Sequence, residues 1–272
     1  MTRATGGTTG AASSGGAAGG PAGRQDAISE FVLSAGSVTA AELAERYKVS
    51  LMTIHRDLDE LERRGVVRKF RGGVTAQPSG VFESNVAYRR KSMLAEKNAV
   101  ADRALALIEP GMAVMLDDST TVLALARRLP GITPLTVVTN FLEGLNLLAG
   151  APGIRLMAVG GDHDPLHDSF LGVACVEAVE SLSVDLCFVS TSAVSGGYAY
   201  HQEQHIVSVK RAMIAAAARN VLLLDNTKLG RAALHRLAPL SAFERVIVDS
   251  GASADSLRDL DEHKVNYEVA SA

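Results

Sequence analysis

Residues 39–73 of the chain read TAAELAERYKVSLMTIHRDLDELERRGVVRKFRGG, and this stretch decides the fold of the N-terminal part. Thr39 and Glu42 have the spacing of a capping box, which predicts a helix start at Thr39. Ser50 predicts the start of a second helix. In that second helix three apolar side chains recur at i, i+4 and i+7 and share one buried face: Ile54, Leu58 and Leu61. The stretch is therefore predicted to form two short helices joined by a tight turn.

The other face of the second helix is polar, and positive charge follows it. Met52, Arg56 and Arg63 fall on this face at about 100° per residue. Five basic side chains with no acid between them come next: Arg63, Arg64, Arg68, Lys69 and Arg71. This order of elements indicates a winged helix-turn-helix, with the helix-turn-helix at 38–57. A helical hairpin that only packs is the alternative, and the basic wing favours the DNA-binding interpretation.

The polar face and the wing supply the predicted contacts with duplex DNA. His55 and Arg56 are expected at base edges in the major groove, and Met52 and Thr53 at thymine methyl groups. Basic side chains of the wing contact phosphates. The whole predicted DNA-binding set is Ser50, Met52, Thr53, His55, Arg56, Arg63, Arg68, Lys69 and Arg71. Because one module covers few base pairs, a homo-oligomer, either a dimer or a tetramer, is expected.

The composition of the whole chain is that of an ordinary globular protein. Its 272 residues, 47% of them hydrophobic, leave room for two domains. The net charge of −3 does not announce nucleic-acid binding, but a chain average hides a local basic patch. No apolar run approaches the ~20 residues of a membrane helix, and no signal peptide is recognisable, so a cytoplasmic protein is expected. Cys175 and Cys187 are expected to be buried small hydrophobes.

Pattern and composition divide the chain into five segments. Residues 1–23, rich in Gly, Ala, Ser and Thr, are predicted to be a disordered tail. The winged helix-turn-helix domain occupies 24–76, a linker 77–95, an α/β domain 96–252 and a C-terminal extension 253–272. The α/β class follows from strands that alternate with helices, which is typical of a mostly parallel sheet. Strands are predicted at 113–116, 135–138, 154–159, 186–190, 221–224 and 246–248, and helices at 96–108, 121–129, 141–148, 172–182 and 202–219.

Polar side chains follow the ends of several predicted strands. Because the carboxyl ends of parallel strands meet at one edge of a sheet, a ligand is expected in the crevice there. Ser119, Thr120 and Thr121 come at a predicted helix N-terminus, which favours an anion such as phosphate. Lys228 can add a positive charge, and the glycines at 160–161 permit close backbone approach. A strand followed by Ser-Thr-Thr is often only a helix cap, but several polar clusters at one edge favour a small-molecule site.

The same residues resemble a known family. The stretch 39–73 resembles the DNA-binding domain of the DeoR family of bacterial transcriptional regulators, and EKNAVADRALALIEPGMAVMLDDSTT, TVVTNF and LLLDNTKLG look like its sensor domain. The resemblance implies a sensor domain similar in fold to ribose-5-phosphate isomerases. It also implies repression of carbohydrate or related genes, with operator DNA as partner and a phosphorylated sugar or related metabolite as effector. The implied effector-binding residues are Asp117, Ser119, Thr120, Thr121, Asn140, Gly160, Gly161, Glu203, Lys210, Asp225 and Lys228.

An enzyme is the alternative function at this stage. In a sugar-phosphate isomerase with an accessory DNA-binding domain, Asp117, Glu203 and Lys228 would serve as acid, base and electrophile. The wing and the recognition helix favour a regulator without catalytic residues or a cofactor. Whether the regulator represses or activates is not separable from sequence.

A second cluster consists of possible metal ligands. Its members are Asp162, His163, Asp164, His167 and Asp168, together with His201 and His205 at i, i+4. A zinc site needs three or four ligands that converge, and spacing along the chain does not establish convergence. A polar loop without a metal is therefore the favoured interpretation.

Overall fold

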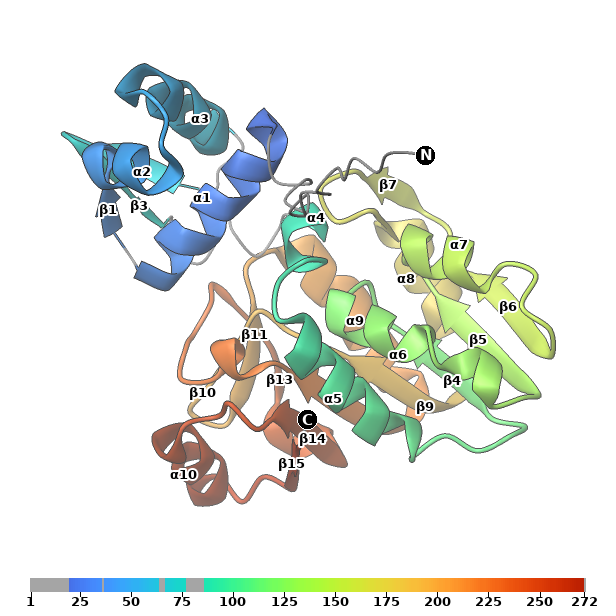
Figure 1. The fold of residues 1–272 in the computed structure, drawn as a ribbon. Coiled ribbons are helices and arrows are strands. Elements are labelled where there is room, and N and C mark those ends of the chain that lie inside the picture. The colour runs from blue at the N-terminus through green and yellow to red at the C-terminus, as the bar shows by residue number, and fades with distance from the viewer. Residues whose placement is uncertain (1–19, 36, 64–66, 77–85, 272) are drawn as a thin grey trace, which may run out of the picture. The chain divides into compact units, whose positions relative to one another are not determined.

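The computed structural model describes residues 20–35, 37–63, 67–76 and 86–271 (Figure 1). The chain forms two compact units, Met1–Pro78 and Ser79–Ala272. Most of the predicted tail, the basic residue Arg64 and the first half of the predicted linker lie outside the described residues. The end of the predicted tail belongs to helix α1, which begins at Pro21.

The N-terminal unit is a winged helix-turn-helix, as predicted. It contains three helices, α1 (Pro21–Ala35), α2 (Ala40–Tyr47) and α3 (Leu51–Arg63). A small sheet with the strand order β1-β3-β2 completes it, formed by Ser37–Thr39, Gly73–Ala76 and Val67–Phe70. The strand β1 was not predicted. Its middle residue Val38 is buried and joins the core that the helices build from Ile28, Val32, Leu43, Ile54, Leu58 and Leu61.

The helix starts form as the sequence predicts. The Thr39 side chain accepts from the backbone N–H of Glu42 at 3.2 Å, and the Glu42 carboxylate accepts from the Thr39 N–H at 2.8 Å. Ser50 Oγ accepts from the Thr53 N–H at 3.2 Å. These contacts satisfy N–H groups that a helix start leaves without partners, and they fix the beginning of α2 and of α3.

A buried ion pair holds α3 to α1, and the sequence analysis did not find it. Asp57 is 3% exposed although it lies on the recognition helix. Arg24 donates to Asp57 through Nε at 2.6 Å and through Nη2 at 3.3 Å, and Gln25 Nε2 donates at 3.0 Å. The pair orients α3 against α1 in addition to the apolar contacts.

The C-terminal unit is built on a seven-stranded sheet in which every pair is parallel, with the order β15-β14-β12-β9-β4-β5-β6. Helices cover both faces of the sheet, so its central strands contain buried apolar runs such as residues 221–224 of β12. The strands are β4 (Ala113–Leu116), β5 (Leu135–Thr139), β6 (Ile154–Ala158), β9 (Val184–Val189), β12 (Ala217–Leu224), β14 (Arg245–Asp249) and β15 (Tyr267–Ala270).

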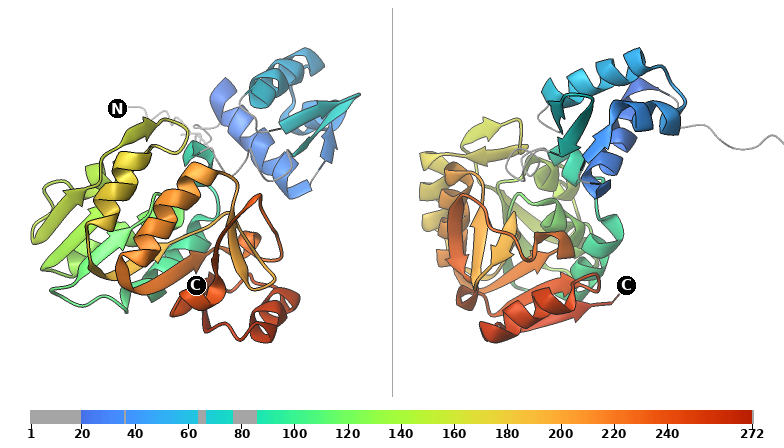
Figure 2. Two further views of the ribbon diagram at one scale, coloured as in Figure 1. Left: turned by 180° about the vertical axis from the view of Figure 1, so that it is seen from behind. Right: turned by 90° about the vertical axis from the view of Figure 1, so that its left-hand side faces the viewer.

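Helices cover the two faces as separate layers. One core contains α5 (Leu94–Leu105), α6 (Thr120–Ala126) and α7 (Leu142–Leu148) with alternate strand residues such as Val114. The other contains α8 (Val173–Glu180) and α9 (Gln204–Ala215) with the intervening residues such as Met115. The left-hand view of Figure 2 shows α8 and α9 in front of the sheet. The unit is a three-layer α/β domain, which confirms the predicted class.

Three parts of the C-terminal unit differ from the expectation. The predicted helix 202–219 ends at Ala215, because the chain turns there into β12. The segment 253–272, expected as an extension, forms α10 (Ala254–Glu262) and the edge strand β15, so it belongs to the domain. The linker prediction is too long, since α4 (Val86–Arg89) and the start of α5 belong to this unit.

Short strands after β6 and β9 were also missed. The hairpin of β7 (Asp162–Asp164) and β8 (Ser169–Leu171) is one of them. The others form a small antiparallel sheet of β10 (Ala193–Ser195), β11 (Tyr198–His201) and β13 (His235–Pro239). Strands of three to five residues carry too little alternation to be recognised from sequence.

The structure bears on two expectations from composition, the burial of the cysteines and the lack of a membrane helix. Cys175 and Cys187 are free and buried, and burial raises the pKa of the Cys175 thiol to about 11. Within the described parts of the chain, the helices are too short or too polar for a membrane crossing.

Candidate functional site

The polar face of α3 is open to solvent. Met52 is 67% exposed, His55 and Arg56 are exposed, and Thr53 is half-buried. The other face is held in the core, where Ile54 is fully buried. A helix fixed by one face and exposed along the other is what insertion into a major groove requires.

The wing is the antiparallel hairpin β2–β3. Its turn contains Gly72 at a φ of 92°, a conformation that glycine adopts far more readily than other residues. The next glycine, Gly73, lies against β1, since a Cβ there would be 2.5 Å from the carbonyl oxygen of Val38. Arg68 and Arg71 are exposed on this hairpin, as phosphate contacts must be.

Two other predicted phosphate contacts are paired within the unit. Arg63 Nη2 lies 2.6 Å from Glu60 Oε1, and Lys69 pairs with Asp59. Exposed ion pairs of this kind contribute little to stability. To contact a phosphate, Arg63 and Lys69 would have to give up their ion pairs with the acids of α3. Arg68 and Arg71 are exposed beside them.

At the carboxyl edge of the parallel sheet, a buried lysine meets two buried aspartates. Asp117 and Asp118 follow β4, Lys210 lies in α9, and each is at most 5% exposed. Lys210 Nζ lies 3.0 Å from Asp118 Oδ1 and also pairs with Asp117 Oδ2. Asp117 accepts from the N–H groups of Ser119 at 3.0 Å and Ser190 at 2.8 Å. These contacts connect the carboxyl ends of β4 and β9 to the middle of α9.

The charges at this edge stabilise one another. Burial alone would lower the pKa of Lys210, but Asp117 and Asp118 raise it above the usual lysine value. Burial would likewise raise the pKa of Asp118, but Lys210, His167 and Arg89 hold it well below the usual carboxyl range. Lys210 and Asp118 are therefore both charged at neutral pH.

Asp118 Oδ2 and Asn140 Oδ1, which follow the ends of β4 and β5, are buried and have no hydrogen-bond partner among the described residues. The same holds for Ser169 Oγ and Arg89 Nε, while the two ring nitrogens of His167 lie 3.4 and 3.5 Å from carboxylate oxygens without hydrogen-bond geometry. Asn140 lies opposite Phe170, to whose carbonyl its Nδ2 donates at 2.8 Å, and the neighbouring Phe141 bridges to Ser169. Buried polar atoms are normally paired. A group of unpaired ones marks a place where a ligand, an ion or water completes the hydrogen bonding.

Family models match both units of the chain. The model of the DeoR-like helix-turn-helix domain covers residues 24–79, and that of the DeoR C-terminal sensor domain covers residues 92–250. The chain belongs to the DeoR family of transcriptional regulators. Relatives named as regulators of this kind match along nearly their whole length, so the two-domain arrangement is shared rather than assembled from separate matches.

Three relatives illustrate the similarity to this DeoR-family regulator, and all come from Escherichia coli K12. The HTH-type transcriptional regulator YgbI is 34% identical over 92% of this chain and 98% of its own. The L-fucose operon activator is 32% identical over 87% of this chain and 98% of its own. The glycerol-3-phosphate regulon repressor is 28% identical over 90% of this chain and 98% of its own. These relatives are named as regulators and not as enzymes.

Solved structures similar to the regulator include ribose 5-phosphate isomerase A from Methanocaldococcus jannaschii. It is 17% identical, with a TM-score of 0.36 over 51% of this chain and 53% of the isomerase.

Some predicted effector residues of the regulator have structural tasks. Gly161 has a φ of 149°, and a Cβ there would be 2.3 Å from the Leu171 carbonyl oxygen, so this glycine serves the approach of β8. Its neighbour Gly160 borders open space. Asp225 accepts from the Thr227 N–H at 3.2 Å and closes the turn that carries the half-buried Lys228.

The predicted Ser-Thr-Thr anion site begins α6. Ser119 Oγ accepts from the Val122 N–H at 3.1 Å and caps the helix, while Thr120 and Thr121 are buried at its first positions. The helix has only seven residues, so its dipole offers limited help to an anion. These contacts show that Ser119 serves as a helix cap, which was the alternative to an anion site.

Glu203 lies among histidines. Its backbone N–H donates to His201 Nδ1 at 3.2 Å, and its carboxylate oxygens lie 3.5 Å from His167 Nε2 and 3.2 Å from His205 Nε2. Sequence reasoning had placed Glu203 with the effector and the histidines in a separate cluster. The structure joins the two groups.

The sequence analysis singled out neither Arg89 nor Ser169, and it did not include Asp118 or His167 in the predicted effector set. Arg89 precedes the domain boundary that the sequence suggested, and Ser169 lies on an unrecognised strand. The adjacent acid in DDSTT was visible, but spacing could not show that a lysine from a distant helix would stabilise it.

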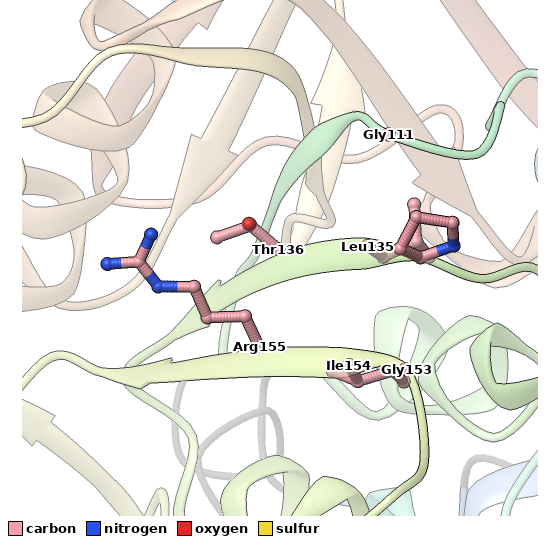
Figure 3. Close-up of a pocket in the computed structure, with 7 residues that line it drawn as sticks. Gly111, Leu135, Thr136, Gly153, Ile154 and Arg155 are labelled. Atoms are coloured by element: carbon pink, nitrogen blue, oxygen red, sulfur yellow. The ribbon is translucent and has the colours of Figure 1, made fainter.

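A shallow pocket also lies at the amino ends of β5 and β6 (Figure 3). Leu135 and Ile154 are the first residues of these strands, and the Arg155 side chain extends beside them. This pocket is at the edge of the sheet away from Asp117 and Asn140. Ligands of open parallel sheets bind at the carboxyl edge, so we place no effector here.

Proposed function

We propose that this regulator represses carbohydrate genes by binding operator DNA through α3 and the wing. A phosphorylated sugar bound at the carboxyl edge of β4 and β5 releases the operator. The observation that carries the effector proposal is the group of buried polar atoms without partners at that edge.

The DNA contacts follow from exposure and charge. Arg56 and His55 are exposed on the open face of α3 and are assigned to base edges, with Met52 and Thr53 beside them. Arg68 and Arg71 are assigned to phosphates, and Arg63 and Lys69 join them by exchanging their acidic partners. Ser50 keeps the start of the helix in place.

The chemistry of the crevice suits a sugar phosphate. Asp118 Oδ2 and Asn140 Oδ1 are buried acceptors for hydroxyl groups, and Ser169 Oγ both donates and accepts. Arg89 offers a guanidinium of the kind that binds phosphate oxygens well. One relative is named for the L-fucose operon and another for the glycerol-3-phosphate regulon, which agrees with a carbohydrate or a phosphorylated metabolite as effector.

A homo-oligomer is part of this proposal. A single recognition helix reads few base pairs, and two half-sites require two copies with a fixed separation. Effector binding would then favour an arrangement of subunits that does not match the half-sites.

Calorimetric titration of the full chain with pentose and hexose phosphates, each beside the free sugar, tests the effector site. We expect the phosphate esters to bind more tightly than the free sugars. Asn140→Ala should weaken the tightest ligand by about tenfold or more, because a buried partner is lost. Asn146→Ala removes an exposed asparagine of α7 and should leave affinity unchanged. Equal affinities of both variants, or of phosphate esters and free sugars, would refute the proposal.

A further inference from the structure

Four potential metal ligands meet where the β7–β8 hairpin approaches the start of α9. Asp164 ends β7, His167 lies in the turn of the hairpin, and Glu203 and His205 stand at the first turn of α9. One donor atom from each of the four lies within 4.8 Å of the donors of the other three. The residues are separated by up to 41 positions in sequence, so the fold and not local spacing brings them together.

The distances between these donors fit a single ion. His205 Nε2 lies 3.4 Å from Asp164 Oδ2 and 3.2 Å from Glu203 Oε2. His167 Nδ1 lies 3.4 Å from the same Asp164 oxygen, while its other ring nitrogen, Nε2, is not part of this donor set and lies 3.5 Å from the second Glu203 oxygen, Oε1. Ligand bonds of about 2.0–2.1 Å in a tetrahedral site place neighbouring donors roughly 3.3–3.4 Å apart. The four side chains need only small rotations to share one metal.

His167 gives an independent sign that something is bound here. Its side chain is 2% exposed, and its ring nitrogens lie 3.4 Å from Asp164 Oδ2 and 3.5 Å from Glu203 Oε1 without meeting the geometry of a hydrogen bond. A neutral imidazole has one N–H donor and one acceptor, and burying both without partners is costly. A metal bond to one nitrogen would satisfy the acceptor.

Contacts around the cluster hold its donors in position. Asp164 Oδ1 accepts from the Leu166 N–H at 2.8 Å and from the His167 N–H at 3.3 Å. The other oxygen, Oδ2, is thereby left facing the two histidines. Outer hydrogen bonds of this kind orient ligands in metal sites.

We propose that Asp164, His167, Glu203 and His205 bind one divalent transition-metal ion, with Zn²⁺ the best match. Two imidazoles and two carboxylates suit Zn²⁺ in tetrahedral coordination, whereas Mg²⁺ and Ca²⁺ prefer shells of oxygen ligands. The ion clamps the β7–β8 hairpin to the start of α9. This departs from the sequence-based expectation of a polar loop without metal, because spacing did not connect Glu203 with the histidines.

Metal binding is tested directly on the full chain after chelator treatment, by titration with Zn²⁺ in the absence of any sugar. The wild-type chain should take up one tightly bound ion, and Mg²⁺ should not compete. His205→Ala and Glu203→Gln should each weaken binding on the order of 100-fold or more, since even outer-shell changes cost 10–100-fold. His163→Ala is the matched control, because this histidine lies on the same hairpin but faces Asp168 at 3.5 Å.

Substitution by Co²⁺ adds a readout of geometry. A four-coordinate site gives an intense visible absorption band, which should appear in the wild type and in His163→Ala and be lost in His205→Ala. Circular dichroism checks the fold, and Glu203→Gln carries the test if His205→Ala unfolds. No stoichiometric Zn²⁺ uptake by the wild type, or uptake unchanged in both ligand variants, overturns the proposal. Because no effector is present, this outcome is independent of the effector proposal.

Discussion

Charged side chains on the polar face of α3 lie in water, whereas those at the carboxyl edge of the sheet are buried. Arg56 is exposed on its helix, and Arg63 pairs with Glu60 at the surface. Lys210, by contrast, is 3% exposed and forms ion pairs with two buried aspartates. An exposed charge costs little to present to DNA, while a buried one must be compensated by its neighbours.

The two regions therefore use charge differently. On α3, the apolar face determines the fold, and the polar face can vary with the DNA sequence that it contacts. At the sheet edge, the charges themselves hold β4, β9 and α9 together, and changing one affects the fold as well as the ligand. Substitutions should separate these two kinds of effect.

Lys210→Met should have the largest effect. It leaves Asp117 and Asp118 buried without their cation, and losing one partner of a buried ion pair costs about 3–5 kcal/mol. Urea unfolding of the full chain should show this loss. Arg258→Met removes an exposed cation that pairs with Asp255, and exposed pairs contribute about 0–1 kcal/mol. If the two variants are equally stable, the buried charges do not hold the sheet edge together.

The free energy of unfolding should depend on pH through the same buried charges, Asp118 and Lys210, with a smaller effect than Lys210→Met. The pKa of Asp118 is lowered in the folded state, so its contribution is present above the unfolded carboxyl pKa of about 3.9 and is lost as the pH falls further. The pKa of Lys210 is raised, so its contribution is lost only as the pH rises beyond the usual lysine value. Asp118→Asn should therefore be less stable than the wild type at neutral pH, and the difference should shrink in acid.

Unfolding of Asp118→Asn and wild type across pH measures that difference. Asp255→Asn, at an exposed position of α10, should differ little from wild type throughout. A difference for Asp118→Asn that is constant down to strongly acidic pH would contradict the assigned ionisation.

Arg24→Ala should destabilise the N-terminal unit by about 3 kcal/mol, at the low end for a buried pair because the arginine is 18% exposed. Asp57 would keep its burial and lose its main cation. Amide exchange at Leu58 and Leu61 reports on α3 without interference from the other unit. Adding Asp57→Asn should restore part of the protection, and Arg63→Ala should leave it unchanged.

Arg56→Ala should act on DNA recognition without affecting the fold. Loss of a base contact should reduce discrimination between operator and random DNA by about 1–3 kcal/mol. Operator DNA can be selected from a random pool with the wild-type chain. Gel-shift titrations of the wild type and of Arg56→Ala, each on the selected DNA and on random DNA, measure this discrimination. Arg68→Ala is the contrasting variant, because a lost phosphate contact weakens all DNA alike. An equal loss on both DNAs for Arg56→Ala would exclude direct readout.

The sequence was most informative where local rules set the structure. Thr39, Ser50 and the stripe Ile54, Leu58 and Leu61 predicted helix starts and the buried face, and each is confirmed. Caps and periodicity act within a few residues, so one sequence is enough to recognise them. The order of strands and helices likewise predicted the α/β class of the second unit.

Sequence reasoning was weaker where distant segments meet. It could not show that Gly161 lies against β8, or that Arg89 and Ser169 carry buried polar atoms without hydrogen-bond partners. Nothing local to Asp118 indicates that Lys210 will lie beside it. Likewise, the ligand set at His167 includes Glu203 only because the hairpin and α9 fold together.

The central claim is that the occupied crevice weakens DNA binding. It is tested most directly by the ratio of operator dissociation constants with and without the tightest sugar phosphate of the calorimetric panel. We predict that saturating ligand weakens operator binding by roughly 5–150-fold, the usual range of coupling between sites, and that Asn140→Ala shifts the response to higher ligand concentration. A ratio of one for a ligand that binds the wild-type chain would contradict the account.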